Sequence, residues 1–97
     1  MLSPGPGKPS EAGICSEIVK AFQGEIPILG ICLGHQVIAE VFDSVVSYAK
    51  EVVHGKAFKL KIMENSPLFK SIDKEFMGAR YHSLAIKRET LGEDLKI

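Results

Sequence analysis

The stretch PILGICLGHQ, residues 27–36, decides the fold of this chain. A β-rich apolar run over 26–31 leads into Cys32, and a helical pattern begins near His35. This order predicts a strand, a tight turn and a helix. A side chain at such a turn lies on strained backbone at the carboxyl edge of a sheet, and flanking glycines leave room for a substrate. The pattern Gly-x-Cys-x-Gly over 30–34 therefore predicts a nucleophile elbow with sulfur in place of oxygen.

The chemistry predicted for this turn centres on the thiol of Cys32. The amide of Leu33, at the start of the helix, would point toward the oxyanion formed when the thiol attacks a carbonyl. The helix dipole would favour negative charge at the same place. Taken alone, the pattern is equally typical of a buried structural cysteine in a strand-to-helix turn. The other motifs of the chain decide between these two interpretations.

The N-terminal residues 2–9 hold three prolines and two glycines. These residue types predict an irregular loop whose backbone amides face a ligand. The run Gly5-Pro6-Gly7 lacks the GK[ST] ending and the GxGxxG frame of loops that bind nucleotide phosphates. Without the later motifs, an ordinary turn or a frayed terminus is the alternative.

Hydrophobic periodicity predicts two helices followed by a β-rich half. The first helix is expected to start at an N-cap on Ser10 and to stop at Gly24, with Cys15 in its apolar stripe as a core residue. The second helix is expected over 35–42. Strands are expected over 45–48, 57–62, 75–81 and 84–87, and a short capped turn over 66–69. Apolar residues alternate with lysines over 57–62, which indicates one solvated face. This order fits an α/β open sheet with helices packed on it.

Composition excludes several classes of function. Ninety-seven residues make one domain at most. Twelve Lys and Arg balance twelve Asp and Glu, so no net charge draws the chain to nucleic acid. The longest apolar run is far shorter than the roughly 20 residues that cross a bilayer, so we expect no membrane role. Two cysteines without a secretory signal favour the cytoplasm. The cysteines and three histidines show no paired ligand spacing, so we expect no metal.

Four sequence blocks together resemble the class I, triad-type glutamine amidotransferases. They are LSPGPGKP at 2–9, GICLGHQ at 30–36, HGK at 54–56 and RYHSL at 80–84. The HGK and RYHSL blocks look most like the glutaminase component of anthranilate synthase and of aminodeoxychorismate synthase, which these motifs do not separate. The resemblance covers essentially all 97 residues. It implies a single partial domain over 1–97 with a partial, open, mainly parallel sheet of the flavodoxin-like kind and a β-rich C-terminal half.

The resemblance also implies a role for each matching residue. Cys32 matches the nucleophile, and the backbone amides of Leu33 and Gly5 match the oxyanion donors. The positions that match substrate-binding residues are Gly5, Pro6, Gly7, Gln36, Ser83 and Leu84. His82 matches the binding motif and not the general base, because the family's catalytic His and Glu belong to a block beyond RYHSL that these residues do not include. We therefore expect a poor glutaminase from this chain by itself.

The implied function is release of ammonia from L-glutamine, without a cofactor, for a chorismate-binding synthase subunit. That subunit would make anthranilate for tryptophan or 4-amino-4-deoxychorismate for folate. The alternative is a truncated, catalytically incompetent fragment, or a remnant that binds a partner. A cysteine hydrolase of the α/β-hydrolase class shares the elbow but leaves SPGPG and RYHSL unexplained. His35 either packs under the elbow or lines the pocket, while His54 and Lys56 either contact a partner or form an exposed loop.

Overall fold

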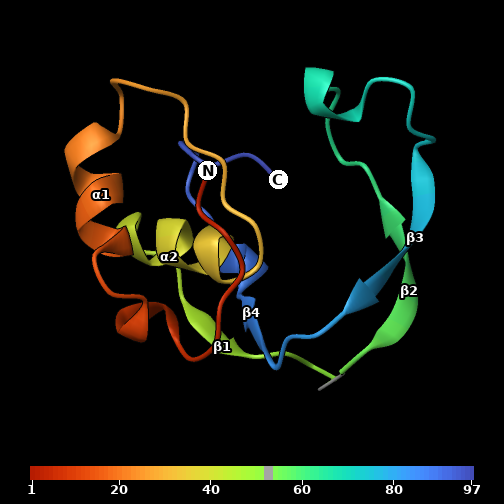
Figure 1. Ribbon diagram of the computed structural model, residues 1–97, viewed down its shortest axis with the longest axis horizontal. Coiled ribbons are helices and arrows are strands. Elements are labelled where there is room, and N and C mark those ends of the chain that lie inside the picture. The colour runs from red at the N-terminus through yellow and green to blue at the C-terminus, as the bar shows by residue number, and fades with distance from the viewer. Residues whose placement is uncertain (52–53) are drawn as a thin grey trace.

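Residues 1–51 and 54–97 are described by the computed structural model (Figure 1). In chain order the elements are the 3-10 helix η1 (Pro9–Glu11), α1 (Cys15–Phe22), α2 (Leu33–Val41), β1 (Val46–Tyr48), β2 (Lys56–Lys61), the 3-10 helix η2 (Pro67–Phe69), β3 (Glu75–Arg80), β4 (Leu84–Ile86) and the 3-10 helix η3 (Arg88–Thr90). The helices α1 and α2 and the β1–β4 pair lie together, and the β2–β3 hairpin, with η2 between its strands, extends away from them. All strands expected from position 45 onward are present to within two residues, as is the capped turn, where the Ser66 hydroxyl accepts from the Leu68 amide at 3.3 Å.

The first helix starts later than the sequence predicts. Ser10 was the expected N-cap, but it lies inside η1, and α1 begins only at Cys15. Gly13 lies between the two elements with φ +62°. A residue in this left-handed region cannot continue a right-handed helix, so the single expected helix is divided in two.

A small apolar core lies between α1 and α2. Val19 of α1 and Val37 of α2 are fully buried, and Leu33 and Ala39 of α2 are nearly so. Cys15 is half-buried at the first turn of α1, so its expected core position is met only in part. The core therefore fixes α2, the helix that follows Cys32, more firmly than α1.

The expected strand over 26–31 is reduced to one parallel bridge between Leu2 and Gly30. The Leu2 amide donates to the Leu29 carbonyl at 2.8 Å, and the Ile31 amide donates to the Leu2 carbonyl at 3.0 Å. In this register the next donor would be the backbone nitrogen of residue 4. That residue is Pro4, which has no N–H, so the ladder ends after one bridge.

The expectation of a mainly parallel sheet is not met in the described residues. Both of their sheets are antiparallel pairs, β1 with β4 and β2 with β3. A hairpin such as β2–β3 pairs two segments that are close along the chain, whereas parallel pairing needs a crossover. Over 1–51 and 54–97, the parallel partners are Leu2 and Gly30, which are joined by a helical crossover, and Pro4 limits their pairing.

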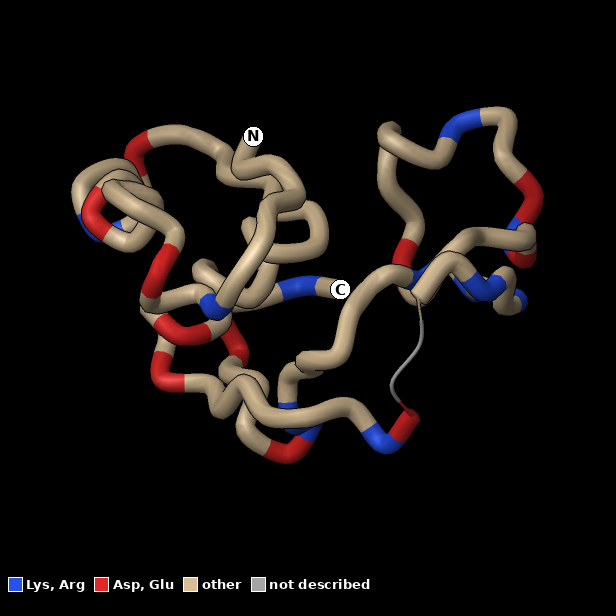
Figure 2. The backbone as a smooth tube through the Cα atoms, turned by 60° about the horizontal axis from the view of Figure 1, so that its bottom comes forward, with Lys and Arg blue, Asp and Glu red and all other residues tan. Residues whose placement is uncertain are grey.

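The β2–β3 hairpin is largely exposed, and its half-buried residues share one face. They are Phe58 of β2 and Gly78 and Arg80 of β3, so the opposite face, with Lys59 and Lys61, is the solvated one. Within β2 only Phe58 is half-buried, and its neighbours in the strand are exposed. A second view of the backbone shows the hairpin still apart from the helices (Figure 2). Lys59 and Glu75 form an exposed ion pair across the two strands at 3.2 Å. Within the described residues no helix has the length and apolar character needed to cross a membrane.

Candidate functional site

The turn before α2 holds Cys32 in a strained backbone conformation. Its φ is +56° and its ψ is −113°, a region that residues with a Cβ rarely adopt. The Cys32 carbonyl accepts from the amides of His35 at 3.1 Å and Gln36 at 3.3 Å. The helix begins at Leu33, two residues before the expected start, so the Leu33 amide has no acceptor within the helix. The predicted strained turn with a free amide beside the thiol is therefore present.

Gly30 and Gly34, on either side of Cys32, serve a different structural purpose from the one expected. A Cβ at Gly30 would lie 2.6 Å from the His35 nitrogen, and a Cβ at Gly34 would overlap the Leu2 carbonyl. Both glycines therefore allow backbone to pack against backbone. We expected them to leave room for a substrate, but their absent side chains make room for the chain itself.

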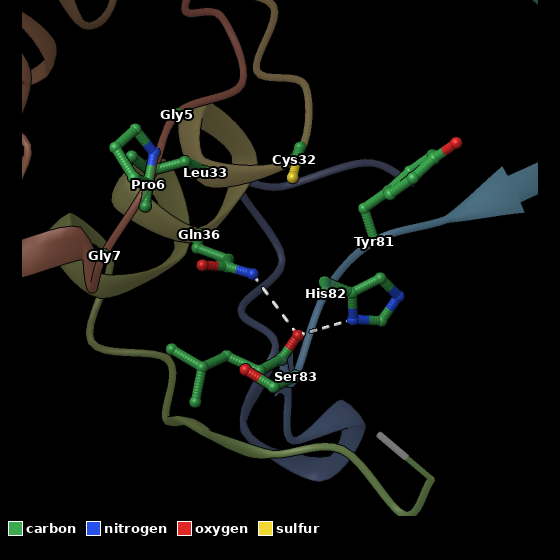
Figure 3. A pocket seen from close by; sticks show the side chains of 10 residues that line it. Gly5, Pro6, Gly7, Cys32, Leu33, Gln36, Tyr81, His82 and Ser83 are labelled. Carbon is green, nitrogen blue, oxygen red and sulfur yellow. Dashed lines mark hydrogen bonds between the residues drawn. The ribbon is translucent and has the colours of Figure 1, made fainter. Parts of the chain in front are cut away.

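A cavity of about 160 Å³ lies beside the Cys32 turn (Figure 3). Its lining residues are Gly5, Pro6, Gly7, Cys32, Leu33, Gln36, Tyr81, His82, Ser83 and Leu84. Every site residue named from the sequence is among them, and they come from three separate segments of the chain. The structure thus brings all of them to one place, while the role of each stays a prediction.

Two walls of the cavity meet at the carbonyl of Leu84. The Gln36 side chain is only 3% exposed, and its Nε2 donates to this oxygen at 3.3 Å. The Nδ1 atom of His82 lies 2.7 Å from the same oxygen (Figure 3). One acceptor therefore joins α2 to the segment that leads into β4.

The second ring nitrogen of His82 is also engaged. Its Nε2 lies 3.1 Å from the Nε atom of Arg80, which can only donate. With both nitrogens in hydrogen bonds, the ring has no vacant site for a proton from the Cys32 thiol. This geometry supports the interpretation of His82 as part of the binding wall and not as a general base.

Tyr81 is the lining residue that sequence reasoning missed. It stands inside the RYHSL block, next to residues to which the resemblance gave roles, so its place in the motif was the signal available. The His54 ring meets the Tyr81 ring edge-on, with centroids 5.2 Å apart. The Gly55 amide donates to the Arg80 carbonyl at 2.8 Å. The HGK block, expected at a partner contact or in an exposed loop, thus packs beside RYHSL.

His35 is not among the residues that line the cavity. Its side chain keeps solvent-exposed surface, yet the surrounding protein atoms lower the pKa of the ring below its ordinary value by desolvation. A hydrogen bond with the Cys32 backbone opposes this shift, and the nearby His82 adds to it. His35 therefore lies beside the elbow with an exposed side chain, so the packing under the elbow expected for it is met only in part.

Metal chemistry has no obvious location in the part of the chain that the structure describes. Over 1–51 and 54–97, no three His, Cys, Asp or Glu side chains gather closely enough to hold an ion. The cavity instead combines one thiol, an unpaired helix-start amide and a glycine-rich loop. This set of groups suits attack on a carbonyl carbon and stabilisation of the resulting oxyanion.

Comparison with known proteins identifies the family. The chain is 46% identical over 91 residues to aminodeoxychorismate/anthranilate synthase component 2 of Bacillus subtilis, covering 94% of this chain and 46% of that protein. It is 44% identical over 95 residues to anthranilate synthase component 2 of Cyanidium caldarium, covering 98% of this chain and 48% of that protein. It is also 42% identical over 97 residues to the bifunctional protein TrpGD of Thermotoga maritima, covering 100% of this chain and 16% of that protein.

The chain spans about half the length of the two component 2 relatives, and much less of the bifunctional one. The family model for glutamine amidotransferase class-I matches residues 1–97, which is the whole chain. The four motif blocks that surround or adjoin the cavity lie inside this match. The chain therefore belongs to the class I glutamine amidotransferase family.

Proposed function

We propose that this chain carries the nucleophile and the glutamine pocket of a glutamine amidotransferase component that supplies ammonia to a chorismate-using synthase. The observation that supports this most is the meeting of Cys32, the loop over 5–7 and the segment over 81–84 around one cavity. The cavity is smaller than the roughly 300–1,000 Å³ typical of sites for drug-sized ligands. Its size favours a small polar metabolite such as an amino acid.

In the proposed reaction the Cys32 sulfur attacks the carboxamide carbon of glutamine. A C–S bond forms and the carbonyl electrons move to oxygen, where the amides of Leu33 and Gly5 donate hydrogen bonds. The electrons then return, the C–N bond breaks, and the nitrogen takes a proton and leaves as ammonia. Water adds to the remaining thioester, releasing glutamate and the thiol.

The proton transfers require a general base that the described cavity does not supply. Both nitrogens of His82 are hydrogen-bonded, to Arg80 and to the Leu84 carbonyl. The resemblance assigns the task to a His and Glu block beyond RYHSL. General acid–base catalysis is worth about 10²–10⁴-fold, so we propose that the 97 residues alone turn over glutamine slowly.

The proposal extends to fold and partner. In a complete family domain, the segments of Leu2 and Gly30 would be adjacent strands of a parallel, flavodoxin-like sheet, because they already form a parallel bridge. The names of the Bacillus subtilis and Cyanidium caldarium relatives give anthranilate synthesis, and the former also gives aminodeoxychorismate synthesis. We propose a chorismate-binding synthase subunit as the partner and the cytoplasm as the location.

The test is covalent capture by a chloroketone analogue of glutamine, followed by peptide mass spectrometry of the 97-residue chain. Cys32 should be labelled in a saturable manner, and excess glutamine should slow the labelling. Cys15, also half-buried, is the internal control and should stay unlabelled.

Two variants complete this design. Cys15→Ser should leave the labelling unchanged, and Cys32→Ser should abolish it. Equal labelling of both thiols, or labelling that glutamine does not slow, would contradict the proposal. Preferential capture by an ester-type probe would favour a hydrolase of another class.

A further inference from the structure

We infer that Arg80 is a positioning residue of the cavity, acting through the ring of His82. Arg80 does not itself line the cavity. Its Nε atom lies 3.1 Å from His82 Nε2. The inference that this contact serves glutamine binding rests on the proposed function, whereas its effect on the His82 ring does not.

The hydrogen-bond partners of His82 determine its tautomer. The guanidinium of Arg80 is a donor only, so His82 Nε2 must accept and carries no proton. The Leu84 carbonyl is an acceptor only, so His82 Nδ1 must donate to it. The contacts on both sides therefore select the neutral ring with its proton on Nδ1. Either the other tautomer or the protonated ring would place two donors face to face at Nε2.

The selected tautomer fixes where the cavity wall lies. His82 Nδ1 donates to the Leu84 carbonyl at 2.7 Å, and Gln36 Nε2 donates to the same oxygen at 3.3 Å. If the proton moved to Nε2, the unprotonated Nδ1 would face the carbonyl oxygen and repel it. Arg80 thus keeps this oxygen in the position where Gln36 of α2 can also reach it.

The hairpin holds the guanidinium of Arg80 in place. Arg80 is the last residue of β3 and pairs with Lys56 of β2. Its Cζ atom lies 4.5 Å from the centroid of the Phe58 ring, a cation–π distance. Phe58 is the residue of β2 that is half-buried. This contact gives the projecting hairpin a structural connection to the cavity.

The direct test is ¹⁵N NMR of the imidazole rings in the 97-residue chain at neutral pH. Wild-type His82 should show the tautomer protonated at Nδ1. Arg80→Met removes one of the two contacts that select this tautomer, so the share of rings that carry a proton on Nε2 should rise, although the Leu84 carbonyl still favours a proton on Nδ1. Arg80→Lys, which restores a donor, should recover part of the wild-type signal. Lys59→Met, on the same hairpin, should have no effect, because Lys59 faces Glu75 and not His82.

The wild-type spectrum alone decides the tautomer, whether or not a variant folds. A wild-type His82 ring protonated at Nε2 would overturn the inference. An unchanged Nε2 signal in a folded Arg80→Met variant would overturn it too. Phe58→Leu keeps the donor but removes its aromatic contact, so it should give a smaller shift than Arg80→Met.

Capture of Cys32 by the glutamine chloroketone tests the functional part. Arg80→Met should raise the chloroketone concentration that gives half-maximal labelling by about tenfold, which is the loss expected for a hydrogen bond from a charged donor. It should leave the maximal rate of labelling nearly unchanged. An equal fall in affinity and maximal rate, not recovered in Arg80→Lys, would contradict positioning. If the wild type is not captured at all, the proposed function fails, while the tautomer still tests the link from Arg80 to His82.

Discussion

The backbone of Gly34 lies directly against the carbonyl of Leu2, with no room for a side chain between them. Gly34 is in the first turn of α2, and Leu2 forms the parallel bridge to Gly30. This contact places the helix start, and with it the Leu33 amide, next to the N-terminal segment. The loop over 5–7 continues from that segment into the cavity.

Gly34→Ala should destabilise the chain strongly. The added methyl group would overlap the Leu2 carbonyl, and backbone cannot move aside as a flexible side chain can. Overpacking of this kind costs about 1–3 kcal/mol. Urea unfolding followed by circular dichroism measures the loss. Gly92→Ala is the matched control, because a Cβ there would meet nothing within 4 Å. Equal unfolding midpoints for the two variants would show that the Gly34 contact is not tight.

Cys32→Gly should be more stable than Cys32→Ala by about 1 kcal/mol, although both lose the thiol. The φ of +56° at position 32 is strained for alanine and accessible to glycine. At position 15, the first residue of α1, Cys15→Ala should instead be more stable than Cys15→Gly, because glycine weakens a helix. Comparing the four free energies of unfolding checks this. Alanine matching glycine at position 32 would argue against backbone strain.

The free energy of unfolding should decrease as the pH falls, and part of this decrease should come from His35. Partial desolvation by neighbouring protein atoms lowers the pKa of His35 in the folded chain, so the unfolded chain binds the proton more readily. The contribution is complete above the ordinary pKa of about 6.5 and is lost as the pH falls from there toward the folded value. His35→Gln should flatten the dependence of the unfolding free energy on pH in this window. An unchanged slope in a folded His35→Gln variant would contradict this assignment.

Cys32→Ser should separate two activities in a longer protein that carries this segment and a synthase partner. Synthesis from glutamine should fall below detection, because no thioester can form. Synthesis from ammonium salts should persist, because ammonia then needs no release. Product formation with each nitrogen source gives the answer. Loss of both activities would point to a structural role for the thiol.

Local patterns in the sequence predicted much of the β-rich half. Apolar residues alternating with lysines located β2, and Ser66 before Pro67 located the capped turn, because these signals depend on neighbouring residues. The errors come from backbone effects of single residues. Gly13 divides the first helix, and Pro4 removes the donor that would extend the strand over 26–31.

The candidate site was predicted in two ways. The strained turn at Cys32 follows from its flanking residues alone. That Ser83 and Leu84 line the cavity beside Cys32 could be predicted only from the family resemblance, because periodicity does not say which distant segments meet. Tyr81 and Arg80 were missed for the same reason. Their contacts, with the His54 ring and the His82 ring, depend on the hairpin register.

The hydrogen bond from Gln36 to Leu84 joins positions 48 residues apart, and the loop over 5–7 adds a third distant segment to the same cavity. Bringing such distant segments together has a larger entropic cost than forming a local helix or hairpin. The cavity should therefore be among the last features to form during folding, after α2 and the β2–β3 hairpin. A ligand that occupies it would bind only chains that have completed this step, and so would select finished molecules from partly folded ones.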